Sequence, residues 1–346
     1  MNKTPKQSGY RLPAEWEKHE AIWLSWPYDK VSFPDRVAII EDRFAEIIRA
    51  IHKSERVELL VTDEKMKIRA ARKLENMKVD LKLVNLRVAD YADVWFRDFG
   101  PSFIVNGEKK QLAMVDWNYN AYGGKWLELL RDDKIPVWMN DSLGLQYFKP
   151  GITLEGGAIE VNGQGTLMTT EECLLNENRN PKLSKNDLEK YLSDYLGASN
   201  FIWLKNGLAN DHTDGHIDNI ARFTGPDSII YVYESDVNDI NYSALKENLE
   251  ILKVAKDQDG NKFNLIGLPL PKIADENGRR IPASYANFYI GNEVVLVPVF
   301  GHNNDKIALE VIKKAFSDRM VIGIDSGDLI YGGGTIHCIS REQPAL

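Results

Sequence analysis

Four stretches of the sequence share one pattern, in which two apolar runs flank a turn signal such as Asn-Gly, Gly-Pro-Asp or Gly-Asn. They cover residues 102–117, 158–170, 221–233 and 288–301. This pattern predicts β-hairpins. Glycine-bearing acidic stretches introduce three of them, and the markers Gly100, Gly156 and Gly215 follow one another after 56 and 59 residues. Such a period indicates a repeated ββαβ-like module, and about five modules fit into the chain.

Amphipathic helical patterns lie between the hairpins, and each leads into a further apolar strand. The expected helices are 34–55, 63–77, 184–197 and 304–318, and the strands after them are 57–62, 81–88, 201–204 and 320–324. Ser184 and Asp187 form the capping signal of the third helix. In the last helix we expect one apolar face, made by Ile307, Ala308, Val311, Ile312, Ala315 and Phe316.

The modules predict a single catalytic α/β domain over residues 1–346 that closes into a ring, because no linker rich in Pro, Gly or Ser divides the chain. A doubly wound parallel sheet is the alternative architecture. The chain has a formal net charge of -8, which disfavours nucleic acid and anionic membranes as partners. No window reaches the length of an apolar membrane span, and the start lacks the core of a signal peptide. With only two cysteines, we expect a cytoplasmic protein without a disulfide framework.

Unusual polar residues gather where the predicted hairpins begin. In a ring of modules these starts surround a common axis, so their side chains should converge. They are Asp98 in "VWFRDFGP", Glu155 in "TLEGG", His216 and Asp218 in "DHTDGHIDN", and Cys338 in "GGGTIHCIS". A thiol, a histidine and several carboxylates in one cleft predict a nucleophilic site.

Each candidate has a structural alternative. Cys173, in "EECLLN", is best interpreted as a buried apolar residue. Asp98 and Arg97 could form a structural ion pair, and Trp95 could belong to the core.

A metal site is a rival interpretation of "DHTDGHID", where His212 and His216 stand among Asp211, Asp214 and Asp218. Gly215 interrupts any helix that would align the two histidines, and no HExxH or CxxC signature is present. We therefore expect no metal.

The combination of residues favours a cationic substrate. Carboxylates close to a thiol oppose formation of the thiolate, which argues against papain-like hydrolysis. Two carboxylates can instead grip a guanidinium group bidentately and leave its central carbon facing a nucleophile. The three glycines before Cys338 suit this role, because they allow the backbone to approach a ligand closely.

These motifs resemble the bacterial agmatine and peptidylarginine deiminase family of guanidino-modifying enzymes. The resemblance extends over nearly the whole chain, through "LPAEWEKHEAIWLSWP", "DVWFRDFGP", "WNYNAYGGK", "LEGGAIEVNGQGTLMTTEECLLNENRNP", "TDGHIDN" and "GGGTIHCISREQP". It implies a five-bladed α/β propeller (pentein) with pseudo-fivefold symmetry and a hydrolase without cofactor. A small cationic guanidine is the implied partner, and a homodimer is the family expectation.

The resemblance also implies roles at matching positions. Cys338 would be the nucleophile and His216 the general acid and base. Asp98 and Asp218 would grip the guanidinium, and Glu155 would support the histidine or a substrate nitrogen. Along the rest of the substrate, Trp95 would form an apolar wall and Gly334 would lie against the ligand.

One position departs from the family pattern. His212 holds a place where an acidic residue is common in agmatine deiminases, and neighbouring Asp211 is the expected substitute for binding the substrate amine. Agmatine is the expected substrate, with another guanidine or an amidinotransferase reaction as alternatives. The same propeller also serves a non-enzymatic ribosome-binding factor, so a binding function is the rival from another class.

Overall fold

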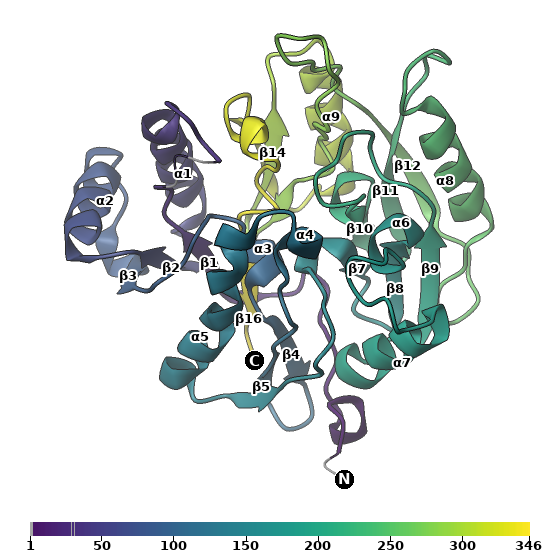
Figure 1. Cartoon of the computed structure of the whole chain (residues 1–346), viewed down its shortest axis with the longest axis horizontal. Helices are drawn as coiled ribbons and strands as arrows, with labels where there is room; N and C mark the ends of the chain where they lie inside the picture. Colours follow the sequence, from purple (N-terminus) through teal and green to yellow (C-terminus); the bar gives the residue numbers. More distant parts are fainter. Residues whose placement is uncertain (1–2, 29, 31) are drawn as a thin grey trace.

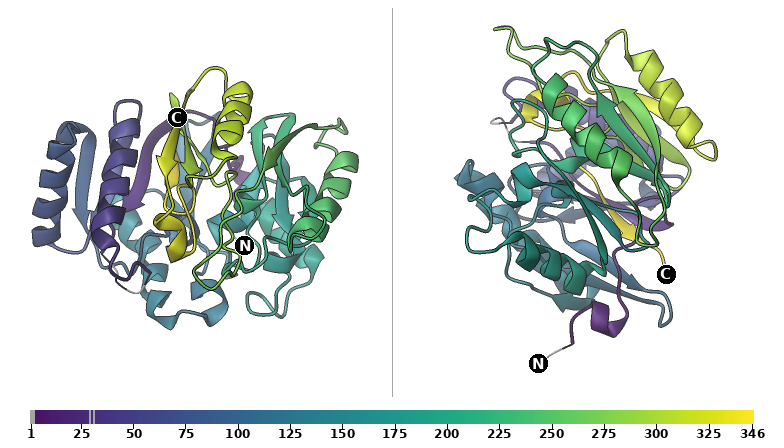
Figure 2. Two further views of the ribbon diagram at one scale, coloured as in Figure 1. Left: turned by 90° about the horizontal axis from the view of Figure 1, so that it is seen from above. Right: turned by 90° about the vertical axis from the view of Figure 1, so that its right-hand side faces the viewer.

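The computed structural model describes residues 3–28, 30 and 32–346, and this part of the chain contains five β-sheets. The sheets surround the centre of the molecule, and most of the helices lie on its outside (Figure 1). Helices α1 and α2 lie at one end of the long axis and α8 at the other (Figure 2).

Four of the sheets repeat one unit: an antiparallel hairpin, followed after helical segments by a strand that pairs in parallel with the second hairpin strand. Their strands are β4 (Ser102–Asn106), β5 (Gln111–Val115) and β6 (Gln146–Phe148); β7 (Ile159–Val161), β8 (Thr166–Thr170) and β9 (Asn200–Leu204); β10 (Ala221–Gly225), β11 (Ser228–Tyr233) and β12 (Asn264–Pro269); and β13 (Tyr289–Ile290), β14 (Val294–Val299) and β15 (Met320–Asp325). All four predicted hairpins are therefore confirmed.

The fifth sheet joins the two ends of the chain. Strand β16 (Arg341–Pro344) pairs antiparallel with β1 (His19–Ser25), and β1 pairs in parallel with β2 (Arg56–Val61). A further parallel strand, β3 (Val84–Val88), extends this sheet. The first module thus takes its first strand from the end of the chain, which closes the ring and gives the predicted five-bladed α/β architecture.

The helices connect the strands of each module, except one that leads from β3 of the fifth sheet into β4. They are α1 (Val37–Ile51), α2 (Glu64–Asn76), α3 (Phe96–Phe99), α4 (Ala121–Gly124), α5 (Ile135–Leu143), α6 (Glu171–Leu174), α7 (Lys185–Leu196), α8 (Tyr242–Val254) and α9 (Asp305–Ala315). Ser184 and Asp187 form the predicted capping box of α7. Among the described residues, no helix combines the length and apolarity needed to cross a bilayer.

Two local predictions are wrong. Residues 81–88 were expected to form one strand, but Leu81–Leu83 form a 3-10 turn because the Asp80 carboxylate accepts a hydrogen bond from the Lys82 N–H. In α9, Ile307 is 49% exposed, whereas Ala308 and Ile312 are fully buried. The buried face of this helix is therefore narrower than its apolar pattern indicates.

Candidate active site

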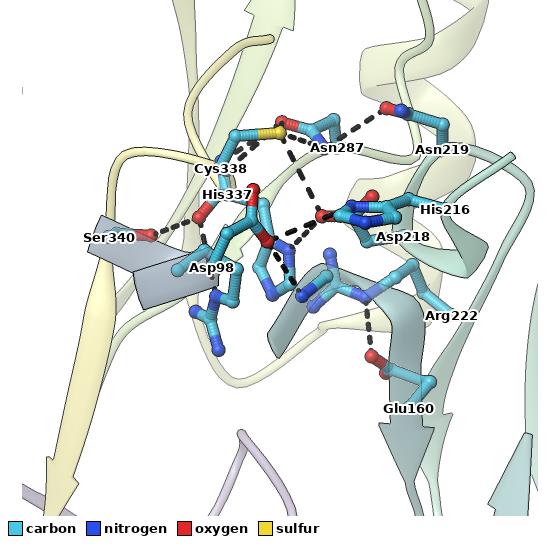
Figure 3. A network of polar contacts seen from close by, with 12 residues as sticks. Asp98, Glu160, His216, Asp218, Asn219, Arg222, Asn287, His337, Cys338 and Ser340 are labelled. Carbon is cyan, nitrogen blue, oxygen red and sulfur yellow. Dashed lines mark hydrogen bonds and ion pairs between the residues drawn. The ribbon is translucent and has the colours of Figure 1, made fainter. Parts of the chain in front are cut away.

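The polar side chains singled out above occupy equivalent places in the modules. Each lies on the short segment that leads into the first strand of a module, and these segments converge at the centre of the ring. Asp98 precedes β4, Glu155 precedes β7, His216 and Asp218 precede β10, and Cys338 precedes β16. Four segments far apart in sequence therefore build one site, and Figure 3 shows a large part of its polar network.

Cys338 is buried at the centre of this network. Its Sγ lies 3.1 Å from Nδ2 of Asn287 and 3.8 Å from Oδ2 of Asp218. Burial raises the pKa of the Cys338 thiol well above its ordinary value, and the charges of Asp218 and Asp98 raise it further. In the empty site the sulfur is thus a neutral thiol at physiological pH.

Asn287 is a site residue that the sequence analysis missed. Besides contacting the sulfur, its Oδ1 accepts hydrogen bonds from Thr335 Oγ1 at 2.7 Å and from the His337 N–H at 3.1 Å. It lies just before β13, the place that the other site residues occupy in their modules. The glycine-bearing acidic marker is absent there, so the repeat position alone could have pointed to it.

Asp98 is held by neutral donors. The Tyr122 hydroxyl donates to Oδ2 at 2.8 Å, and the Gly157 N–H donates to Oδ1 at 3.0 Å. Burial raises the pKa of Asp98, and the neighbouring Asp218 charge raises it as well, so that His216 offsets only part of the shift. The alternative interpretation of Asp98, an ion pair with Arg97, does not apply, because Nη1 of Arg97 pairs with Glu342 at 2.7 Å.

A glycine permits the candidate catalytic groups to converge. A Cβ atom at Gly157 would lie 2.6 Å from Nδ1 of His216 and 2.9 Å from both Oδ2 of Asp218 and Oδ1 of Asp98. Any larger residue would force these three side chains apart. Gly157 is the second glycine of the "EGG" motif, and this lack of space explains why the position requires glycine.

The surroundings of His216 favour the protonated form of its ring. Its Nδ1 lies 3.7 Å from Oδ1 of Asp98, and neither ring nitrogen has a hydrogen-bond partner among the described residues. Burial lowers the pKa of His216, but Asp98, the Cys173 thiol and Asp218 outweigh it and raise this pKa well above the ordinary value. The imidazole is therefore cationic at neutral pH.

Glu155 lies beside the histidine. Potential ligand atoms of Glu155, Cys173 and His216 are all within 4.8 Å of one another. Oε1 of Glu155 accepts a hydrogen bond from Arg179 Nε at 2.6 Å, while Oε2 has no partner among the described residues. Cys173 is fully buried, as predicted, and its sulfur contributes to the surroundings of His216.

A pocket of about 180 Å³ leads to the Cys338 sulfur, and both Trp95 and Gly334 line it. Nε1 of Trp95 donates to Oδ2 of Asp93 at 2.9 Å, which fixes the indole. A Cβ atom at Gly334 would lie 2.9 Å from the Cys338 sulfur and 2.9 Å from the Trp95 ring. The glycine run thus keeps open the narrow space between indole and thiol.

Asp211, the predicted ligand of the substrate amine, is engaged in a local turn. Its Oδ1 accepts hydrogen bonds from the N–H and the hydroxyl of Thr213, at 2.9 and 2.7 Å. Like Glu155, His216 and Asp218, it is not among the described residues that line the pocket. His212 and Glu128 do line the pocket. Burial lowers the pKa of His212, and Asp211 offsets this only in part, so His212 is a neutral part of the wall at neutral pH.

The rival metal site has no support in the described residues. The groups of three or more potential ligands there are Glu155–Cys173–His216 and Glu15–Glu160–His337, and neither contains His212. The pair His212 and His216, on which the metal interpretation rested, is therefore not assembled into a cluster.

Comparison with known proteins identifies the family. The family model described as Porphyromonas-type peptidyl-arginine deiminase matches residues 11–344. The chain belongs to this family. A curated family member from Legionella pneumophila (strain Paris), provisionally named agmatine deiminase, is 39% identical and covers 99% of this chain and 98% of its own.

Solved structures agree with this family in fold. The agmatine deiminase of Enterococcus faecalis has a TM-score of 0.93 and 31% identity, and the alignment covers 100% of this chain and 98% of that chain. A cysteine-to-serine variant of the agmatine deiminase of C. jejuni, with substrate bound, has a TM-score of 0.85 and 31% identity, with 96% of both chains covered. This family member thus shares its architecture with agmatine deiminases over essentially its full length.

Proposed function

We propose that this protein is an agmatine deiminase, which hydrolyses agmatine to N-carbamoylputrescine and ammonia through a covalent S-alkylthiouronium intermediate on Cys338. One observation carries the proposal: two carboxylates, an imidazolium and a thiol converge in a single buried site. Asp98 and Asp218 supply the counter-charges for a guanidinium. Cys338 supplies the nucleophile beside them.

The substrate helps to generate its own nucleophile. In the empty enzyme, Asp98 and Asp218 hold Cys338 in the thiol form. A guanidinium charge at about 4 Å favours the thiolate by about 4 kcal/mol at an effective dielectric constant near 20. Asp98 and Asp218 raise the pKa of the Cys338 thiol, and binding of the guanidinium that they attract offsets this rise.

Attack of the Cys338 thiolate on the guanidinium carbon forms a C–S bond and a tetrahedral adduct. His216 donates its proton to a departing nitrogen, the C–N bond breaks, and ammonia leaves a thiouronium cation on the sulfur. Neutral His216 then accepts a proton from an attacking water. The second adduct collapses with cleavage of the C–S bond, and its hydroxyl proton passes to the departing sulfur, so that a neutral ureido product and the Cys338 thiol are formed.

The mouth of the pocket favours an amine at the far end of the substrate. Glu128 lines the pocket and is exposed, so its carboxylate can pair with an ammonium group. Free arginine would instead require a cation for its carboxylate. Arg97 and Arg222, the candidates considered for that role, are buried and pair with Glu342 and with Glu15 and Glu160 respectively.

The test compares ammonia release from agmatine, free arginine and a short arginine peptide, using wild type and Cys338→Ala. Turnover of agmatine that is lost in the variant is the expected result. Preference for another guanidine would support the proposed reaction and contradict agmatine as the substrate. Transfer of the amidino group to an added amine would make the protein an amidinotransferase, and absence of cysteine-dependent turnover of all three substrates would favour a binding function.

A further inference from the structure

His337 directly precedes Cys338 in the sequence, but its side chain contacts Asp218 and Glu15. Its ring points into a buried ionic network beneath the thiol (Figure 3). Nδ1 lies 2.8 Å from Oδ2 of Asp218, and Nε2 lies 2.8 Å from Oε2 of Glu15. All three side chains are buried, with exposed fractions of 1%, 0% and 7% for His337, Asp218 and Glu15.

We propose that His337 is a positioning residue, which keeps Asp218 ionised and holds its carboxylate in place beside the Cys338 sulfur. This inference rests on the proposed function, because it assigns the origin of a charge that the guanidinium requires.

The hydrogen-bond geometry supports a cationic ring. Ionised carboxylates only accept hydrogen bonds, so a histidine placed between two of them must donate from both nitrogens. Imidazolium is the form with two N–H donors. Oδ2 of Asp218 is thereby engaged, while Oδ1 is buried and has no partner among the described residues. Oδ2 also lies 3.8 Å from the Cys338 sulfur, and the unpaired Oδ1 keeps its acceptor capacity for a guanidinium N–H.

The charges around Asp218 show why a cationic partner is required. The groups that face it are Cys338, Asp98, His216, His337, Arg97 and Arg222. Burial raises the pKa of Asp218. The cations around it lower this pKa by more, so that it lies below its ordinary value, and the hydrogen bond and charge of His337 make the largest contribution to the lowering. Asp98, which lacks such a bond to a cation, has a raised pKa.

The second partner of His337 is itself fixed. Oε2 of Glu15 accepts a hydrogen bond from Nη2 of Arg222 at 2.6 Å, and Nε of Arg222 donates to Glu160 at 3.0 Å. The arginine therefore prevents Glu15 from moving toward the site or taking up a proton. Without His337, no cation would lie between the buried carboxylates of Asp218 and Glu15. Asp218 would then be protonated at neutral pH, because Arg222 keeps Glu15 ionised.

The first experiment needs no substrate. Iodoacetamide labelling of Cys338 is followed against pH in wild type, His337→Gln and His337→Phe, by peptide mapping. If Asp218 loses its charge with His337, the nearest anion disappears, the thiol pKa falls, and labelling at neutral pH accelerates several-fold. If Asp218 stays ionised, only a cation has been lost, and labelling slows. Slower labelling would overturn the proposal.

His19→Gln is the matched control. His19 is another buried histidine bonded to a carboxylate, with Nδ1 3.0 Å from Oε2 of Glu55, but it does not contact Asp218. Its replacement is expected to leave the pH profile of Cys338 labelling unchanged. Labelling of buried Cys173 in the same digests reports loosening of the fold, and acceleration at both cysteines would count against the proposal.

Turnover of agmatine supplies the second readout. The His337 variants are expected to lose ten- to a hundred-fold in kcat/KM at neutral pH, and the acidic limb of the profile should move to higher pH. An unmoved acidic limb would overturn the inference even if activity falls. Failure of wild type to act on agmatine would refute the proposed function alone, because the labelling experiment would still decide the role of His337.

A measurement on wild type covers the case in which the variants do not fold. Isotope labelling of the histidine rings lets NMR distinguish an imidazolium from a neutral tautomer. We expect His337 to be an imidazolium at neutral pH. A neutral ring would contradict the proposal.

Discussion

The side-chain amide of Asn287 donates to the Cys338 sulfur across 3.1 Å. A donor at this distance stabilises the thiolate more than the thiol, whereas Oδ1 of the same side chain, 3.4 Å from the sulfur, can accept a hydrogen bond only from the thiol. Hydrogen bonds to charged groups contribute about 1.5–3 kcal/mol. Asn287→Ala is therefore expected to lower kcat/KM about 10- to 100-fold.

Asn287→Asp sharpens this prediction. The new side chain has nearly the same shape, but it replaces the donor by a negative charge beside the sulfur. We expect lower activity than in Asn287→Ala and a higher pKa of the Cys338 thiol, measured by iodoacetamide labelling against pH. An activity within twofold of wild type in either variant would contradict this role, and melting temperatures show whether the fold is retained.

Local patterns in the sequence predicted the modules well. The hairpins carry their own turn signals, and the capping box of α7 is contained within four residues, so neither depends on distant parts of the chain. The family resemblance and the position of the hairpin starts also indicated five residues that the structure brings together. This success reflects the repeat, because every lead-in segment faces the same centre.

The missed residues depend on contacts between modules. His337 lies within the "GGGTIHCIS" motif next to Cys338, but its partners Glu15 and Asp218 are 322 and 119 positions away. Nothing local reveals them. Asp211 shows the opposite case, because its carboxylate accepts a hydrogen bond from the N–H two residues ahead, a local turn contact that competes with the predicted role in binding the substrate amine.

Removing the charge of Asp218 should change two measurements in opposite directions. Asp218 lies 3.8 Å from the Cys338 sulfur and raises the pKa of the thiol, so Asp218→Asn lowers this pKa. The thiolate then forms at lower pH, and iodoacetamide labelling of Cys338 at neutral pH becomes faster. Turnover of agmatine falls by at least about a hundred-fold, because the guanidinium loses a counter-charge. Slower labelling, or unchanged turnover, would refute the assignment.

Gly334 is predicted to be essential for steric reasons. In Gly334→Ala the new Cβ would lie 2.9 Å from both the Cys338 sulfur and the Trp95 ring, and these groups would have to separate. We expect at least about a tenfold loss of kcat/KM, since small misplacements of reacting groups are costly. Gly107→Ala is the matched control, because no atom lies within 4 Å of its added Cβ. Equal activities of the two variants would contradict the prediction.

Glu128 should select the tail of the substrate rather than affect the chemistry. Its carboxylate lines the pocket from an exposed position, where an ion pair contributes about 0.2–1 kcal/mol. Glu128→Gln is therefore expected to raise KM for agmatine by up to about fivefold, with little change in kcat. Butylguanidine has the same chain without the amine, so its KM should not respond to the substitution. Glu108→Gln, which removes an exposed charge in the β4–β5 hairpin, is the control for the general field of the protein. Equal effects of Glu128→Gln on both substrates would show that this carboxylate does not bind the amine.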